Sequence, residues 1–139
     1  MCLQESGEMY LETIWILLKN SNRIRSVDVS RYMGYTKPSV SRAIGLLKKG
    51  GYITTDEYGY LHLTELGEET AERLYQRFVI LSRFLISIGV SEKIAEKDAC
   101  RMEHYMSDET FLAVSRYILN PNSEYSACFL SFSVLLLPQ

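Results

Sequence analysis

The sequence predicts a mainly α-helical chain with one small β-hairpin. Apolar residues recur at helical spacing in three short segments before residue 50 and in three more after residue 64. Between these groups, two short runs rich in aromatic and β-branched residues flank a turn, which is typical of a hairpin. The length of 139 residues suits one compact domain or two small domains that share an interface.

The first two helices are predicted from apolar spacing and from the residues at their ends. Residues 9–19 form an amphipathic helix, and a polar Asn-Ser-Asn stretch ends it. A shorter helix is expected over residues 27–33. We expect Ser26 to be its N-cap and Gly34 to close it.

The third helix is expected to begin at an N-cap Thr36. Its first turn holds Pro38, where the missing N–H costs nothing. The helix runs to Lys49, and a Gly-Gly pair stops it. Its apolar residues are spaced i, i+4, i+7 and predict one buried stripe of Val40, Ile44 and Leu47.

A hairpin follows, with strands over residues 52–55 and 60–63 and a turn at 56–59. Three helices followed by a hairpin is the order of a winged helix-turn-helix. We therefore place an N-terminal winged helix-turn-helix domain at residues 1–64, with the hairpin as the wing.

The second half is predicted to be a helical domain at residues 65–119. A long amphipathic helix starts at Thr64 and ends at Gly89, and Ser91 and Ser107 are expected to cap two further helices. The long helix has an apolar stripe of Leu74, Phe78, Leu81, Leu85 and Ile88.

An apolar tail occupies residues 120–139. Its apolar run, residues 125–137, is shorter than the roughly 20 residues that a membrane-spanning helix needs. We expect it to cover a hydrophobic surface or to extend a dimer interface, since exposed apolar patches tend to be interfaces. No membrane association is predicted.

The charge is unevenly distributed along the chain. The net charge is −2, but residues 1–49 hold eight basic and four acidic residues, a local charge of +4, and the remainder carries −6. One basic end can bind phosphate while the acidic end keeps the protein soluble. The three cysteines, Cys2, Cys100 and Cys128, form no CxxC pair, and no secretory signal is visible. A reducing cytoplasm is therefore expected.

The start of the third helix is the candidate DNA-binding surface. The N-terminal residues of a recognition helix meet base edges in the major groove. Arg42 can reach guanine or phosphate, Arg25 and Lys37 are expected to clamp phosphates, and the acidic wing tip should bind phosphate weakly. Winged helices also serve as protein-interaction modules, an alternative that the pattern leaves open. The predicted DNA-binding residues are Arg25, Thr36, Lys37, Pro38, Ser39, Ser41 and Arg42.

A second constellation has the chemistry of a metal site. Cys100, Glu103 and His104 stand at i, i+3 and i+4, so a helix places them on one face. Thiolate, carboxylate and imidazole together can coordinate a first-row divalent metal. Three ligands leave the coordination sphere of the metal incomplete, and Met9 is the candidate for the fourth ligand. A lone helical cysteine is also commonly a small core residue, so spacing alone leaves both interpretations open.

Taken together, several segments resemble the diphtheria-toxin-repressor family of iron- and manganese-dependent regulators. The resemblance covers about residues 7–118, in the family's order. The matching segments are EMYLETI at 8–14, KPSVSR at 37–42, LKKGGY at 47–52, LTELG at 63–67 and DACRMEHYMSDE at 98–109.

This resemblance implies a metal site between a winged helix and a helical dimerisation domain. Iron-type members use a methionine, cysteine, glutamate and histidine at the positions of Met9, Cys100, Glu103 and His104, whereas manganese-type members have carboxylates in place of the first two. The sequence therefore sides with the iron type, and Fe(II) is expected ahead of Mn(II). Glu12 matches a further manganese-type ligand and is an additional candidate.

Two features depart from the family pattern. The family's second, ancillary metal is held by residues whose positions are Phe78, Ser82 and Glu96 here, so we expect one principal metal site per subunit. The chain also ends before a third domain of the SH3 type could be built, which resembles the short two-domain members.

The sequence thus predicts a homodimeric, metal-dependent DNA-binding regulator, with repression of metal-homeostasis genes expected from the family. The alternative is a DNA-binding regulator that senses oxidants or another effector through Cys100. No base-and-nucleophile pair and no phosphate loop is apparent, so neither an enzyme nor a small-molecule substrate is predicted.

Overall fold

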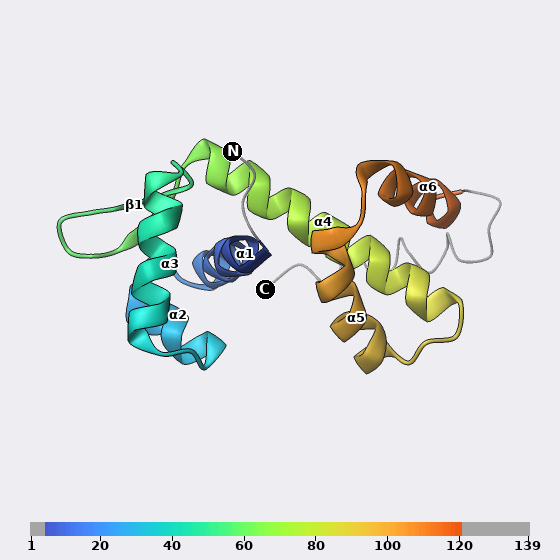
Figure 1. Ribbon diagram of the computed structural model, residues 1–139, viewed down its shortest axis with the longest axis horizontal. Coiled ribbons are helices and arrows are strands. Elements are labelled where there is room, and N and C mark those ends of the chain that lie inside the picture. Colours follow the sequence, from blue (N-terminus) through green and yellow to red (C-terminus); the bar gives the residue numbers. More distant parts are fainter. Residues whose placement is uncertain (1–4, 121–139) are drawn as a thin grey trace. The chain divides into compact units, whose positions relative to one another are not determined.

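The computed structural model describes residues 5–120, the side chain of Glu5 excepted (Figure 1). It confirms a mainly helical chain with one hairpin. Cys2, Cys128 and residues 121–139 of the predicted tail lie outside the described residues. The elements in order are α1 (Glu5–Asn20), α2 (Ser26–Met33), α3 (Lys37–Lys49), β1 (Ile53–Thr55), β2 (Leu61–Leu63), α4 (Glu65–Ser87), α5 (Glu92–Tyr105) and α6 (Asp108–Ile118).

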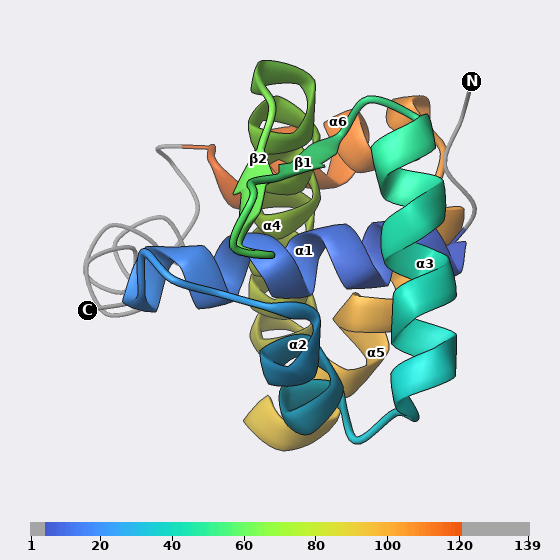
Figure 2. The ribbon, with the colours of Figure 1, turned by 90° about the vertical axis from the view of Figure 1, so that its left-hand side faces the viewer.

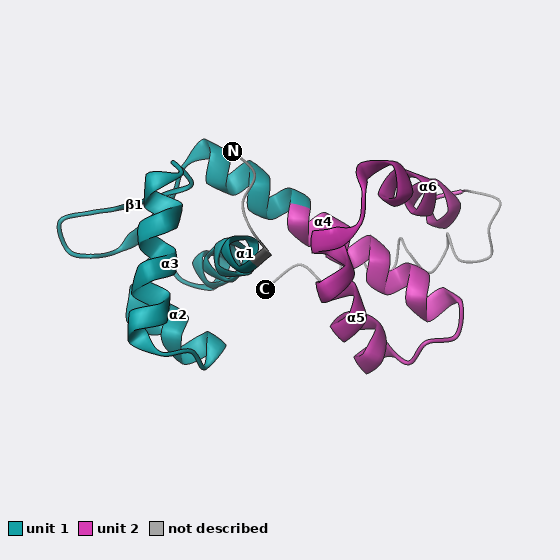
Figure 3. Cartoon of the chain, viewed as in Figure 1, with its two compact units in different colours: residues 1–73, 139 teal, residues 74–138 magenta. Residues whose placement is uncertain are grey.

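The chain forms two compact units that divide within α4, between Arg73 and Leu74 (Figure 3). Unit 1 contains α1, α2, α3, the hairpin and the start of α4. Unit 2 contains the rest of α4 with α5 and α6.

Unit 1 is built around helices α1, α2 and α3, which pack against one another (Figure 2). The predicted stripe of α3 is buried, which confirms its orientation. The hairpin is antiparallel and pairs Ile53 with Leu63, and Ile53 is 1% exposed. The N–H of Leu61 donates to the carbonyl of Ile24 at 2.8 Å, so the hairpin is tied to the connection between α1 and α2. Burial of these side chains supplies the main stabilisation of the unit.

The start of α2 differs from the sequence prediction. The N-cap is Arg25, not Ser26, and the helix begins one residue earlier than expected. The reason is Asp28 in the first turn. Its carboxylate accepts the N–H of Arg25 at 2.8 Å and so caps the helix at Arg25. The predicted end at Gly34 is confirmed, in the left-handed conformation with φ 71°.

The start of α4 lies directly against the hairpin. Thr64, the predicted first residue of the helix, directly precedes α4. It donates its hydroxyl to the carbonyl of Gly51 at 2.6 Å and accepts the N–H of Gly67 at 3.1 Å, so it caps the helix. A Cβ on Gly67 would meet the carbonyl oxygen of Tyr52 at 2.0 Å. Only glycine therefore permits this close approach between α4 and the backbone just before β1.

Unit 2 follows the predicted order of helices. Gly89 lies beyond α4 at φ 104°, and the hydroxyl of Ser107 accepts the N–H of Thr110 at 3.2 Å to cap α6. Leu74 and Leu81 of the predicted α4 stripe are buried, whereas Ile88 is 58% exposed because α4 ends before it. Among the described residues, no helix is both long and apolar enough to cross a membrane.

Candidate functional site

The start of α3 presents a polar, basic surface. The core stripe of α3 occupies the opposite side of the helix, so the residues between its members face outward. The hydroxyl of Thr36 accepts the N–H of Ser39 at 3.4 Å, which confirms the predicted N-cap. All the predicted contact residues of this helix are exposed, namely Thr36, Lys37, Pro38, Ser39, Ser41 and Arg42.

Arg25 is held by an aromatic ring of the hairpin. Its guanidinium carbon lies 4.5 Å from the ring centroid of Tyr60. Such a cation–π contact orients the side chain and leaves its positive charge in place to bind phosphate. Tyr60 was missed at the level of sequence, because no periodic pattern links a residue next to β2 with the N-cap of α2.

One of the two acidic residues of the wing, Asp56, is hydrogen-bonded within the hairpin. Asp56 accepts the N–H groups of Tyr58 at 2.9 Å and Tyr60 at 3.0 Å, and its other oxygen lies 2.9 Å from Nε2 of His62. The hydrogen bond from His62 is the main cause that lowers the pKa of Asp56. The carboxylate of Asp56 therefore stabilises the turn of the hairpin, while Glu57 is exposed.

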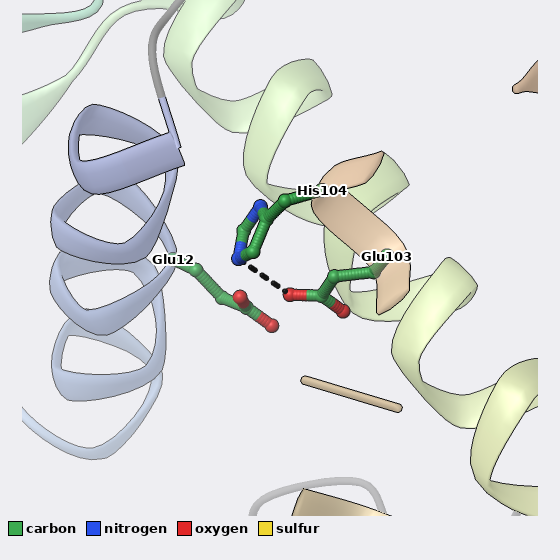
Figure 4. Close-up of side chains that lie close together, drawn as sticks. All are labelled: Glu12, Glu103 and His104. Carbon is green, nitrogen blue, oxygen red and sulfur yellow. Dashed lines mark ion pairs between the residues drawn. The ribbon is translucent and has the colours of Figure 1, made fainter. Parts of the chain in front are cut away.

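Helix α5 carries the three candidate metal ligands of unit 2. The carboxylate of Glu103 lies 3.3 Å from Nε2 of His104 (Figure 4), and the two side chains are 0% and 1% exposed. Cys100 stands one turn earlier and is half-buried. A divalent cation would compensate the charge of a carboxylate that is withdrawn from water. The donor types therefore fit a transition metal.

The remaining two candidate ligands belong to unit 1. Met9 and Glu12 lie on α1, one turn apart, and Met9 is half-buried. Glu12 is drawn with the α5 pair in Figure 4. The candidate donors are thus divided between two helices and between two units.

Arg77 secures the end of the helix that carries His104. From α4, its guanidinium donates to the carbonyl of Met106 and to a carboxylate oxygen of Asp108 at 3.3 Å. It also lies 5.0 Å from the ring centroid of Phe111. Arg77 therefore joins α4 to the junction of α5 and α6. No sequence pattern indicates this role, because Arg77 is one of several charged residues on the long helix.

The positions expected for a second metal carry few donors. Phe78 packs near Tyr75 with ring centroids 6.2 Å apart, and Ser82 is buried at 4% exposure. Glu96 is exposed on α5. These side chains are in keeping with a single principal site, which stays a prediction.

Both units match the domains of one family of regulators. Residues 2–61 match the model of the iron-dependent repressor N-terminal DNA-binding domain. Residues 64–125 match that of the iron-dependent repressor metal-binding and dimerisation domain. The chain belongs to the iron-dependent repressor family. This membership confirms the resemblance and the winged-helix architecture derived from the sequence.

Two relatives of the family illustrate the similarity. The chain is 31% identical over 109 residues to an uncharacterised helix-turn-helix transcriptional regulator of Methanocaldococcus jannaschii, covering 77% of this chain and 87% of that protein. It is 34% identical over 102 residues to the transcriptional regulator MntR of Lysinibacillus sphaericus, covering 73% of each. These matches support a metal-dependent transcriptional regulator over a sensor that acts through the thiol of Cys100 alone.

Solved structures share the fold over most of this chain. The manganese regulator SloR matches with a TM-score of 0.74 at 22% identity over 87% of the chain. The metal-dependent transcriptional regulator MtsR matches with a TM-score of 0.76 at 24% identity over 84%. The chain spans 56% and 54% of the lengths of those two proteins, respectively.

Proposed function

We propose that this chain is a homodimeric repressor that binds double-stranded DNA when loaded with Fe(II). The observation that carries this proposal is the buried Glu103–His104 pair on α5 in a domain of the metal-binding and dimerisation type. A DNA-binding regulator of this kind acts in the cytoplasm, where Cys100 would stay a reduced thiol. The target genes are proposed to be those of metal homeostasis.

The proposed ligands are Met9, Cys100, Glu103 and His104, with Glu12 as an additional oxygen donor. Two sulfur donors distinguish this set from an all-carboxylate site. Softer thioether and thiolate ligands favour Fe(II) over Mn(II), which prefers oxygen donors. We propose one principal metal per subunit, because Phe78 replaces a ligand of the ancillary site.

Regulation follows from the division of the ligands between the units. A metal bound by residues of both units would restrict their relative motion. In a dimer this would hold two recognition helices at the spacing of DNA half-sites, about 34 Å apart. Without metal, the affinity for DNA is reduced by the fraction of molecules in the competent geometry. Metal and DNA must then strengthen each other's binding by the same factor.

The test is DNA binding as a function of metal. A duplex is first selected from a random library with metal-loaded protein, and its affinity is then measured with chelator, Fe(II), Mn(II) or Co(II) at constant salt. We expect Fe(II) to raise the affinity about 5- to 150-fold, the usual range of allosteric coupling. Equal affinity in chelator and in every metal would overturn the proposal, and a larger effect of Mn(II) would reassign the metal.

The chain contains a matched control for the ligand assignment. It has two histidines, His62 on the hairpin and His104 on α5. His104→Ala should abolish metal binding and the metal effect while retaining weak, salt-dependent DNA binding. His62→Ala should bind the same amount of metal as the unsubstituted chain. Loss of metal in both variants would mean that folding, not ligation, had been disturbed.

A further inference from the structure

The first helix is anchored to unit 1 next to a proposed metal ligand. Tyr10 is 7% exposed and directly follows Met9 on α1. The described side chains before it, residues 6–9, are exposed or half-buried. Tyr10 is therefore the first buried side chain that the structure describes on this helix. Tyr10 therefore links the start of α1 to the interior of unit 1.

The ring that meets Tyr10 belongs to the turn before the recognition helix. Tyr35 lies between Gly34, the left-handed end of α2, and Thr36, the N-cap of α3. Its carbonyl accepts the hydroxyl of Ser30 at 2.6 Å, which fixes its backbone to α2. The position of Tyr35 is thus coupled to the direction in which α3 begins.

The two rings are in direct contact. Their centroids lie 6.0 Å apart with an interplanar angle of 57°, a favourable tilted arrangement. Burial is the main cause that raises the pKa of the Tyr10 hydroxyl, and the neighbouring Tyr35 adds to it. Tyr35 itself is not a core residue, since 46% of it is exposed. Its contact with α1 is therefore not explained by burial in the core.

We propose that Tyr35 is a positioning residue that transmits the metal-bound state of α1 to the DNA-facing start of α3. The inference rests on the proposed function, because it requires Met9 or Glu12 to bind the metal. A metal held by α1 fixes the helix end that carries Tyr10, and the Tyr10–Tyr35 contact then fixes the turn before Thr36. Without the contact, the start of α3 is free of that restraint.

The experiment replaces Tyr35, whose exposure makes the substitution compatible with folding. Affinity for the selected duplex is measured with chelator and with Fe(II) for the unsubstituted chain, Tyr35→Leu and Tyr35→Phe. We expect Tyr35→Leu to reduce the gain in affinity caused by metal about 2- to 12-fold, the range of an aromatic pair, and to leave the affinity in chelator unchanged. Tyr35→Phe keeps the ring and should retain the gain.

Metal affinity without DNA is measured in parallel through the absorption of Co(II). It should be the same in all three proteins, since none of the substitutions touches a proposed ligand. An equal loss of DNA affinity with and without metal would show that Tyr35 contacts DNA or merely supports the turn, and would overturn the inference alone. Absence of any metal effect in the unsubstituted chain would overturn the proposed function and this inference together.

Discussion

Single side chains in unit 1 connect elements that are far apart in the sequence. Glu68 on α4 accepts hydrogen bonds at the same oxygen from Nε1 of Trp15 and from Nζ of Lys19, each at 3.0 Å. Lys19 also lies 4.9 Å from the ring centroid of Trp15. These contacts join α4 to the helix that carries Met9. Helical spacing indicates which side of α1 is apolar, but it contains no information about the partner at residue 68.

The pair between Glu68 and Lys19 predicts a stability that depends on pH. The hydrogen bond from Lys19 is the main cause that lowers the pKa of Glu68 below its ordinary value of 4.5, against the opposing effect of burial. A lowered pKa stabilises the fold at pH values above 4.5, and the stabilisation is lost as the pH falls through the lowered pKa. Glu68→Gln should therefore reduce the free energy of unfolding at pH 7 by less than about 1 kcal/mol, because the side chains of Lys19 and Glu68 are 43% and 45% exposed and water screens the pair.

Urea denaturation at pH 7 and at pH 3.5 checks this prediction. The difference between Glu68→Gln and the unsubstituted chain should shrink at the lower pH. Glu69→Gln is the matched control, since its side chain is exposed on the neighbouring position of α4. A difference that stays constant between the two pH values would assign the effect to packing around Trp15.

At the scale of elements, the ends of helices decide how the DNA-facing surface is presented. Thr36 and Pro38 predict the start of α3 correctly, because capping and proline are local chemistry. The start of α2 is predicted one residue late, because Asp28 within the helix takes over the capping. The start of α3, which carries the proposed DNA contacts, therefore depends on the N-cap Thr36, and a single substitution can remove that cap.

Replacing Thr36 tests this dependence. Thr36→Ala removes the acceptor of the Ser39 N–H and should destabilise the protein by about 1 kcal/mol. It should also weaken binding to the selected duplex, since the first turn of α3 frays. Thermal unfolding and DNA titration measure the two effects, and Thr36→Ser should restore both. A destabilised variant with unchanged DNA affinity would show that the first turn of α3 does not face the bases.

At the scale of the whole molecule, unit 2 exposes large apolar side chains that its own helices leave uncovered. They occur at the end of α4, in the connection that follows it, on α5, on α6 and at the C-cap of α6. A domain of the metal-binding and dimerisation type accounts for such a surface if a second copy of the chain covers it. The exposed residues are Ile86, Ile88, Ile94, Tyr105, Leu112, Tyr117 and Leu119.

Charged substitutions on this surface should dissociate the dimer. Leu112 and Ile88 are 50% and 58% exposed, so Leu112→Glu or Ile88→Glu should leave the fold of unit 2 intact. Each is expected to lower the molecular mass measured by sedimentation toward that of a monomer. Leu46→Glu is the control, because Leu46 is 63% exposed on unit 1. Unchanged mass in both unit 2 variants would place the dimer interface elsewhere.

Local sequence patterns predict the order of elements, the buried stripe of α3 and the candidate ligands on α5. These features depend on residues close together in the chain, where periodicity, capping and glycine conformations act locally. Which distant side chains meet depends on how the helices and the hairpin pack. The contacts of Arg25 with Tyr60, Arg77 with Met106 and Tyr10 with Tyr35 join separate elements. Such pairs arise from packing in three dimensions, which no spacing along the chain encodes.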